Sequence, residues 1–137
     1  MSNGVFKISN PANEPVLSYK PGSPERKQLK DSISTLRNIE IEIPCIVGGK
    51  EVRTGNMGEC RIPHEHGHIL ARYHKAGPKE AALAIDAAGK SASAWKNLPW
   101  EHRLSLFERA SDLLAGPFRQ LLNAATVLGQ SKNAFQA

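Results

Sequence analysis

Histidine is the residue type with the most chemical potential in this sequence of 137 residues. His64, His66 and His68 alternate within one short run, Glu65 lies between the first two, and His74 is nearby. Imidazoles and carboxylates bind zinc, and alternate residues of a strand lie on one face, so these side chains could converge on a metal. Gly67 interrupts the run, however, and the composition is typical of a polar turn whose imidazoles bond to backbone or water. We therefore assign no metal ligand here.

The two cysteines are the candidate nucleophiles. Cys45 lies in the apolar run 43–47, where surrounding hydrophobic residues make a thiol unreactive. Cys60 has charged neighbours and is expected to be exposed, but no base accompanies it at a recognisable spacing. One pair of cysteines cannot form a disulfide framework, so we expect two free thiols in a reducing compartment. The sequence predicts no catalytic cysteine.

Phosphate-binding and nucleic-acid-binding patterns are missing from the sequence. There is no G-x-G-x-x-G after a candidate strand and no Walker motif, and the Gly-Gln-Ser-Lys run at 129–132 lacks the upstream glycines. The net charge is +5, but acidic and basic residues are mixed without a basic stripe between aromatics, which argues against nucleic-acid binding. No apolar run approaches the roughly 20 residues that span a membrane. We name no catalytic, cofactor-binding or metal-binding residue.

The elements that must position these residues begin with an arm and a helix. Prolines and glycine break any period over 1–22, which we interpret as an extended arm. Val16, Leu17 and Tyr19 could anchor it on a surface, and a disordered tail is the alternative. A Ser-Pro-Glu start signal then predicts an amphipathic helix over 23–38.

Short strands are predicted over 41–74. Isoleucines and glutamates alternate at the start of this region, and the Gly-Gly pair at 48–49 predicts a small antiparallel hairpin. Two further extended runs, 60–63 and 69–74, flank the histidine turn at 64–68.

Helical periodicity dominates the rest of the chain. It predicts helices over 78–96, 99–115 and 117–128. The first has a face of small residues around Gly89, which suggests close packing, and Trp95 and Trp100 are expected to act as packing anchors. Gly129 ends or kinks the last helix. Together these elements predict an α+β fold with several helices and a small antiparallel hairpin.

Several runs, in order along the chain, resemble one known family. They are NEPV at 13–16, PGSPER at 21–26, IPCIVG at 43–48, PHEHGH at 63–68, and the long stretch 103–137. That last stretch reads R-x-x-x-F-x-x-A-x-D-L-L-A-G-P and then V-L-G-Q-S-K-N-A-F-Q-A. The ordered set resembles the Δ1-pyrroline-5-carboxylate dehydrogenases of the aldehyde dehydrogenase superfamily, which have an α/β fold.

This resemblance implies an NAD-dependent enzyme of proline catabolism that oxidises L-glutamate γ-semialdehyde, formed from 1-pyrroline-5-carboxylate, to L-glutamate. In the family a cysteine thiolate attacks the aldehyde, hydride passes to NAD, and a glutamate-activated water releases the acid. Neither Cys45 nor Cys60 matches the motif of that cysteine. The resemblance places the catalytic residues and the NAD-binding strands beyond Ala137. It implies that 23–137 is the N-terminal part of an NAD-binding domain and is inactive alone.

The resemblance also carries expectations about context. It implies a small-molecule substrate and a homo-oligomer for the full-length protein, with no nucleic-acid or membrane partner. The location would be cytoplasmic in a bacterium or the mitochondrial matrix in a eukaryote, although 1–10 does not look like a transit peptide. It implies a helix over 130–137 that runs toward the substrate tunnel, with Phe135 at most near the substrate. The alternative function is a non-catalytic module that binds or caps a full-length subunit.

Overall fold

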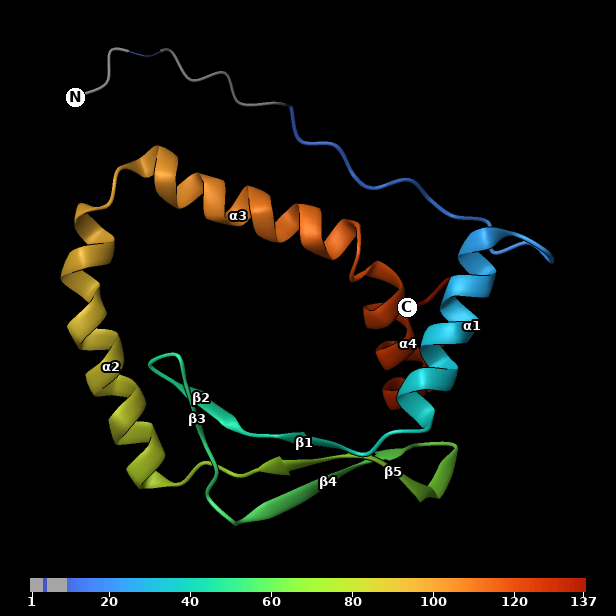
Figure 1. The fold of residues 1–137 in the computed structure, drawn as a ribbon, viewed down its shortest axis with the longest axis horizontal. Coiled ribbons are helices and arrows are strands. Elements are labelled where there is room, and N and C mark those ends of the chain that lie inside the picture. Colours follow the sequence, from blue (N-terminus) through green and yellow to red (C-terminus); the bar gives the residue numbers. More distant parts are fainter. Residues whose placement is uncertain (1–3, 5–9) are drawn as a thin grey trace.

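The computed structural model describes Gly4 and residues 10–137. Figure 1 shows its helices and strands as the sides of an open frame, with the strands along one side and the helices along the others. In chain order the elements are α1 (Pro24–Arg37), β1 (Ile41–Ile43), β2 (Cys45–Val47), β3 (Lys50–Val52), β4 (Met57–Ile62), β5 (Glu65–His74), α2 (Pro78–Asn97), α3 (Trp100–Ala115) and α4 (Arg119–Gln130).

The predicted α+β class is confirmed, and each described helix begins and ends within two residues of its predicted range. The start of α1 follows the sequence signal directly. Ser23 Oγ accepts a hydrogen bond from the N–H of Arg26 at 3.4 Å, and Pro24 occupies the first turn. Local capping chemistry is therefore sufficient to place this helix.

The main core lies where α1 packs on α4. Tyr19, Leu29 and Ala124 are buried together there, so the arm, α1 and α4 share one hydrophobic cluster. The partly buried residues Leu17, Ile33, Leu36 and Ala134 pack against this cluster. Over residues 10–22 the arm is thus anchored at Tyr19 and Leu17, in agreement with the first of the two sequence interpretations, while Val16 is exposed. Residues 1–3 and 5–9 of the predicted arm lie outside the described residues.

The strands form two small sheets. The hairpin of β2 and β3 is confirmed, with Val47 paired to Lys50, and both turn glycines, Gly48 and Gly49, have positive φ. The second sheet has the order β1-β5-β4, in which β4 is antiparallel to β5 but β1 is parallel to it. Periodicity along one strand carries no information about a parallel partner about 30 residues away, so this pairing was not predicted.

Two sequence interpretations are corrected. The expected turn at 64–68 is wrong, because β5 already begins at Glu65 and the turn before it is limited to Pro63 and His64. The expected helix over 130–137 is also wrong. Instead α4 continues through Gly129 to Gln130, Ser131 has φ 54° and stops the helix, and the chain then folds into a turn near Asn133.

The other two helices have little cover within the described part of the chain. Neither α2 nor α3 has a buried residue, and Trp95 and Trp100 are about half-exposed instead of packed as expected. A side chain built at Gly89 would meet no atom within 4 Å, so the close packing suggested for this face is not seen between described residues. None of the described helices is long and apolar enough to cross a bilayer.

Candidate functional site

The histidine run does not converge on one point. His64, in the tight turn, has Nδ1 at 2.6 Å from Ser131 Oγ at the end of α4. His68 Nδ1 lies 4.0 Å from Glu65 Oε1, and the contact recorded for His66 is its backbone carbonyl, which accepts from the Arg61 guanidinium. Within the described residues no group of three or more histidines, cysteines or carboxylates could hold a metal. The imidazoles of His64 and His68 therefore have separate neighbours.

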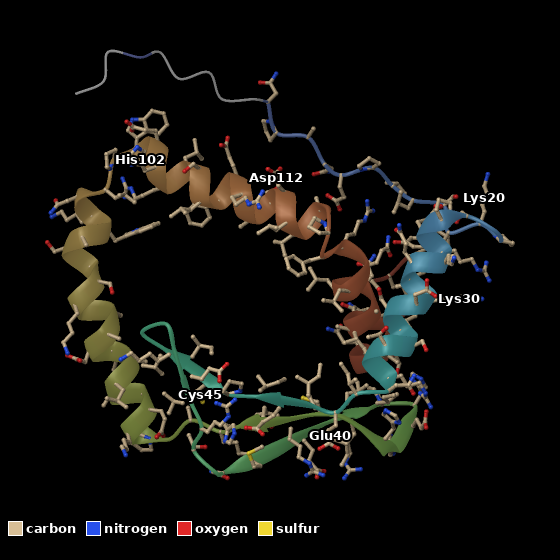
Figure 2. All side chains as sticks on the ribbon, in the orientation of Figure 1. Lys20, Lys30, Glu40, Cys45, His102 and Asp112 are labelled. Carbon is tan, nitrogen blue, oxygen red and sulfur yellow. The ribbon has the colours of Figure 1, made fainter. Side chains whose placement is uncertain are left out.

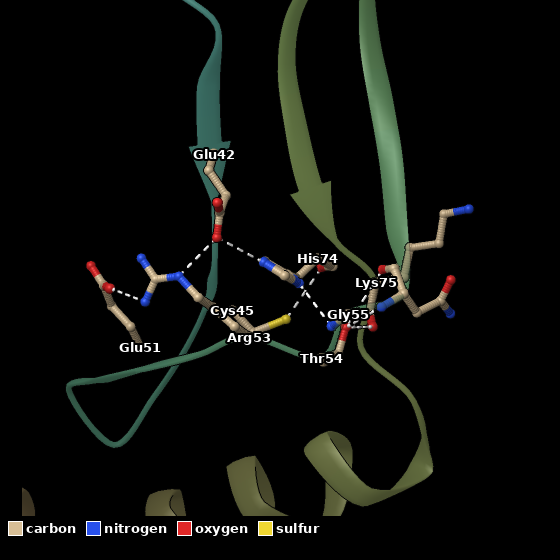
Figure 3. Close-up of polar contacts among 9 residues, drawn as sticks. Glu42, Cys45, Glu51, Arg53, Thr54, Gly55, His74 and Lys75 are labelled. Atoms are coloured by element: carbon tan, nitrogen blue, oxygen red, sulfur yellow. Dashed lines mark hydrogen bonds and ion pairs between the residues drawn. The ribbon is translucent and has the colours of Figure 1, made fainter.

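His74 takes part in a polar cluster that is drawn in Figure 3. Glu42 on β1 is its centre, because one carboxylate oxygen lies 3.1 Å from His74 Nε2 and 2.8 Å from Arg53 Nε. Arg53 also donates to Glu51 Oε2 at 2.7 Å. These contacts join the end of β3 and the end of β5 to β1, and we call them the Glu42 clasp.

The hydrogen bonds of His74 define its tautomer. The N–H of Gly55 donates to Nδ1 at 3.1 Å, so Nδ1 must be unprotonated and the ring proton must be on Nε2, facing Glu42. The imidazole side chain is only 6% exposed. Both ring nitrogens are therefore occupied, which leaves His74 without a free nitrogen for a substrate.

Cys45 lies beside this clasp without pairing with the imidazole. Its Sγ donates to the backbone carbonyl of His74 at 3.3 Å, and the thiol is half-buried. A cysteine nucleophile needs a base or a cation to form the thiolate, and a carbonyl oxygen is neither. Cys60 is exposed on β4, as expected.

Ion pairs connect the residues of the Glu42 clasp and the neighbouring strands of the β1-β5-β4 sheet. Hydrogen bonds from His74 and from Arg53 lower the pKa of Glu42. On the neighbouring strands, Arg72 donates to Glu40 at 2.7 Å and to Glu59 at 2.6 Å. The pKa of Glu59 is lowered by its hydrogen bonds, first from Arg61 and then from Arg72. The polar face of the sheet is thus a ladder of ion pairs that holds β1, β5 and β4 in register.

Tyr19 is the second well-defined polar centre. Its hydroxyl accepts from Asn123 Nδ2 at 3.0 Å and donates to Gln120 Oε1 at 3.4 Å, both on α4. Its backbone N–H donates to Glu25 at 3.2 Å, and its ring meets that of Phe135 edge-on at 6.0 Å. Tyr19 has φ 49°, a costly conformation that these contacts stabilise.

An open groove of about 600 Å³ lies between the arm, α3, α4 and the final turn. Its lining is mainly apolar, with a few polar groups. Its lining includes Leu17, Phe107, Leu114, Arg119, Leu122 and Phe135. The volume is within the range of small-molecule sites, but the groove contains none of the histidines or cysteines considered above.

The N-terminus of α2 does not fit the phosphates of a dinucleotide. A phosphate-binding helix needs a free, positive N-terminus after a strand, and β5 to α2 is the strand-to-helix connection in the described part of the chain. There, Glu80 accepts from the N–H of Gly77 at 2.8 Å, and this hydrogen bond lowers the pKa of the Glu80 carboxyl. Pro78, at the first helical position, has no N–H. A carboxylate already occupies this helix end, so we assign these residues no step involving NAD.

The sequence reasoning missed the Glu42 clasp and the hydrogen bonds of Tyr19. The sequence contains a pattern that indicates the Glu42 clasp. Glu40 and Glu42 are two residues apart, as are Arg72 and His74, so the acidic pair can face the basic pair on adjacent strands. That signal becomes useful only once the parallel pairing of β1 and β5 is known. Nothing in the sequence marks Tyr19 as the arm residue with α4 partners.

Comparison with known proteins gives the chain its family. A family model described as the aldehyde dehydrogenase family matches residues 52–137, which is more than half of the chain. The chain belongs to the aldehyde dehydrogenase family. The match begins in β3 and includes the whole of α2, α3 and α4.

Two aldehyde dehydrogenases similar to this chain are both named Delta-1-pyrroline-5-carboxylate dehydrogenase. A Delta-1-pyrroline-5-carboxylate dehydrogenase of Agaricus bisporus is 41% identical over 134 residues, covering 97% of this chain and 24% of the relative. A mitochondrial protein of the same name from Dictyostelium discoideum is 42% identical, covering 95% of this chain and 23% of the relative. The chain therefore spans about a quarter of the length of these aldehyde dehydrogenases.

Solved aldehyde dehydrogenase structures agree in three dimensions. The Delta-pyrroline-5-carboxylate dehydrogenase of Mycobacterium tuberculosis, bound with NAD and cobalamin, superposes with a TM-score of 0.94 at 39% identity, covering 99% of this chain and 26% of that one. The 1-pyrroline-5-carboxylate dehydrogenase of Thermus, with bound NAD, gives a TM-score of 0.82 at 26% identity, covering 90% of this chain and 24% of that one. The frame of helices and small sheets is thus part of this family's fold.

Proposed function

We propose that this chain is the N-terminal part of an NAD-dependent dehydrogenase that oxidises L-glutamate γ-semialdehyde, derived from 1-pyrroline-5-carboxylate, to L-glutamate. The observation that carries the proposal is similarity over nearly the whole chain, at 39–42% identity, to proteins described as Δ1-pyrroline-5-carboxylate dehydrogenases. NAD and the aldehyde would bind to the part of the protein outside this quarter.

The chain's own contribution is structural in this proposal. Among the described residues neither cysteine is paired with a base, both ring nitrogens of His74 are hydrogen-bonded, and the strand-to-helix connection does not fit a phosphate. We therefore propose that the 137 residues are inactive by themselves. The longer protein would be a homo-oligomer acting on a small molecule, in the mitochondrial matrix of a eukaryote or the cytoplasm of a bacterium. Relatives from Dictyostelium and rat are described as mitochondrial.

A chimaeric enzyme tests the proposed function. This chain would replace the matching quarter of the Mycobacterium tuberculosis enzyme, and NADH formation would be measured with 1-pyrroline-5-carboxylate. We expect a rate within about tenfold of the parent enzyme, because a scaffold that preserves the backbone leaves the reacting groups in place. The purified 137-residue chain should produce no NADH above the blank.

The control is a second chimaera in which an unrelated segment of equal length replaces the same quarter, which should be inactive. A first chimaera that folds but forms no NADH would contradict the proposed function. NADH formation by the isolated chain would contradict the proposal that it lacks catalytic machinery.

The second candidate function is a non-catalytic module that binds or caps a full-length subunit. The observation in its favour is the absence of buried residues on α2 and α3 among the residues that the structure describes. A tagged chain, mixed with the intact Mycobacterium tuberculosis enzyme, should then co-elute with it and alter its oligomeric state. If the chain elutes alone while the chimaera is active, the dehydrogenase proposal is favoured.

A further inference from the structure

The end of α4 does not lie where the local sequence signal places it. Glycine is the residue type that most easily adopts the left-handed conformation with which helices end, and Gly129 is available for that role. In the structure Gly129 stays helical and α4 continues to Gln130. The left-handed residue is Ser131, with φ 54° and ψ 33°, although its Cβ atom makes this conformation costly. A contact from outside the helix is needed to favour the stop at Ser131.

His64 supplies such a contact from the turn between β4 and β5. Its Nδ1 lies 2.6 Å from Ser131 Oγ. A hydroxyl can donate to an unprotonated ring nitrogen or accept from a protonated one, so either tautomer of His64 allows the hydrogen bond. The residues that follow α1, α2 and α3, which are Asn38, Leu98 and Gly116, donate their N–H groups to carbonyls of their own helices. Ser131 makes no such backbone hydrogen bond with a described residue.

The packing of α4 on β4 brings the two side chains together. Ile62 at the end of β4 and Leu128 near the end of α4 are both buried, and they lie close in sequence to His64 and Ser131. Figure 2 shows that α4 runs toward the strands and lies beside α1, on the opposite side of the frame from α2. The hydrogen bond therefore joins two elements whose contacting residues are 67 positions apart in the sequence.

The pair is not arranged as a nucleophile and its base. Ser131 follows the C-terminus of α4, where the helix dipole is negative and opposes the oxyanion that forms when a serine attacks a carbonyl group. The carboxylate next to His64 in sequence, Glu65, is ion-paired with Arg37. The chemistry of this pair is thus a hydrogen bond that fixes the backbone of Ser131.

The stop at Ser131 determines where Phe135 lies. Asn133 Oδ1 accepts from the N–H groups of Phe135 at 3.0 Å and Gln136 at 3.1 Å, which closes the final turn. The ring of Phe135 then meets that of Tyr19 edge-on at 6.0 Å. The final turn is therefore held at its start by His64 and near its end by Tyr19 on the arm.

We propose that His64 is a positioning residue that ends α4 from outside the helix. It holds Ser131 in the left-handed conformation and so turns the chain back toward Tyr19. Without His64, the local signal at Gly129 sets the end of the helix, and the final turn loses its fixed start. This inference concerns the described residues and does not depend on the proposed function.

Hydrogen exchange of the final turn tests the role of His64. It is measured by mass spectrometry in the chimaera described above, because the isolated chain is expected to be marginal. His64→Ala should raise the exchange rate of the Phe135 and Gln136 amides about fivefold, which is the effect expected for the loss of one hydrogen bond. The matched control is His66→Ala, which should leave the rate unchanged, because the contact of His66 is its backbone carbonyl.

Two further variants separate a positioning role from a general loss of stability. His64→Asn should keep the parental exchange rate, because the carboxamide of asparagine is attached at the same carbon as Nδ1 and can still reach Ser131. The double variant His64→Ala/Ser131→Gly should return to within about twofold of the parental rate, because glycine adopts the left-handed conformation without the cost of a Cβ atom.

Equal exchange in the His64→Ala and His66→Ala chimaeras would overturn the proposal. Failure of Ser131→Gly to restore protection in the His64→Ala background would also overturn it, since His64 would then act by a route other than the backbone of Ser131. NADH formation is not part of this readout. A chimaera that folds but is inactive therefore contradicts the proposed function and leaves the test of His64 intact.

Discussion

At the scale of single residues, the chemistry of this chain is used to hold strands together. The histidine with the most complete set of partners, His74, donates to Glu42 and accepts from Gly55, so its ring is fixed on both sides. Cys45 has a carbonyl as its partner instead of a base. Residue types that suggest catalysis in a sequence therefore serve packing and register once their neighbours are known.

The Glu42 clasp predicts a defined response to acid. Because the folded state lowers the pKa of Glu42, its contribution to stability is present above the unfolded value of 4.5 and is lost as pH falls through the lower folded pKa. Glu42→Gln should melt at a lower temperature than the parent at neutral pH, and this difference should shrink as the pH falls below 4.5 and through the lower folded pKa of Glu42. Circular dichroism melts across pH measure it.

The matched control is Glu108→Gln, since Glu108 is exposed on α3 and makes no ion pair with a described residue. It should melt with the parent at every pH. A constant difference between Glu42→Gln and the parent from neutral to strongly acidic pH would contradict the role given to this carboxylate.

At the scale of elements, local signals were sufficient for the helices and for the hairpin, and insufficient for their partners. The cap at Ser23 and the glycine pair at 48–49 act within a few residues, so the sequence around them places α1 and the β2–β3 turn. The pairing of β1 with β5 and the packing of α1 on α4 depend on surfaces formed far apart in the chain.

Tyr19 links the arm to α4 and provides the element-scale prediction. Tyr19→Phe should reduce stability by about 1 kcal/mol, because Asn123 and Gln120 lose their partner while the ring remains. Tyr19→Ala should cost about 3 kcal/mol by opening a cavity in the shared cluster. Denaturant titrations of the chimaera with and without each substitution measure this, because the isolated chain is not expected to unfold cooperatively.

Val16→Ala is the control, since Val16 lies on the same arm but is exposed, and it should be close to neutral. If Tyr19→Ala is as mild as Val16→Ala, the arm is not held by this residue. Simultaneous loss of amide protection in the arm and in α4, followed by hydrogen exchange, would confirm that Tyr19 couples them.

At the scale of the whole molecule, few hydrophobic residues are buried and many large hydrophobic side chains are exposed. The buried hydrophobic residues fall in the α1–α4 cluster and at the strands, while two of the described helices have none. Stability of a few kcal/mol requires more burial than this, so the isolated chain should be marginal.

The corresponding prediction concerns the isolated chain in solution. We expect a broad, weakly cooperative melt and association that increases with concentration, because apolar side chains on α2 and α3 are exposed. Light scattering and calorimetry over a concentration series test this. A sharp melt from a monodisperse monomer would show that the described residues are a self-sufficient domain.

The sequence by itself determined the helix starts, the hairpin, the α+β class and the family, because capping residues, glycine turns and ordered motifs act locally or are read directly. The tertiary structure alone decided three features: the parallel partner of β1, the burial of Tyr19 against α4, and the turn after Ser131 in place of a helix. The first two depend on contacts between residues distant in sequence, and such contacts leave no periodic trace along a single chain. The turn is closed locally, because the side chain of Asn133 accepts from the N–H groups of Phe135 and Gln136.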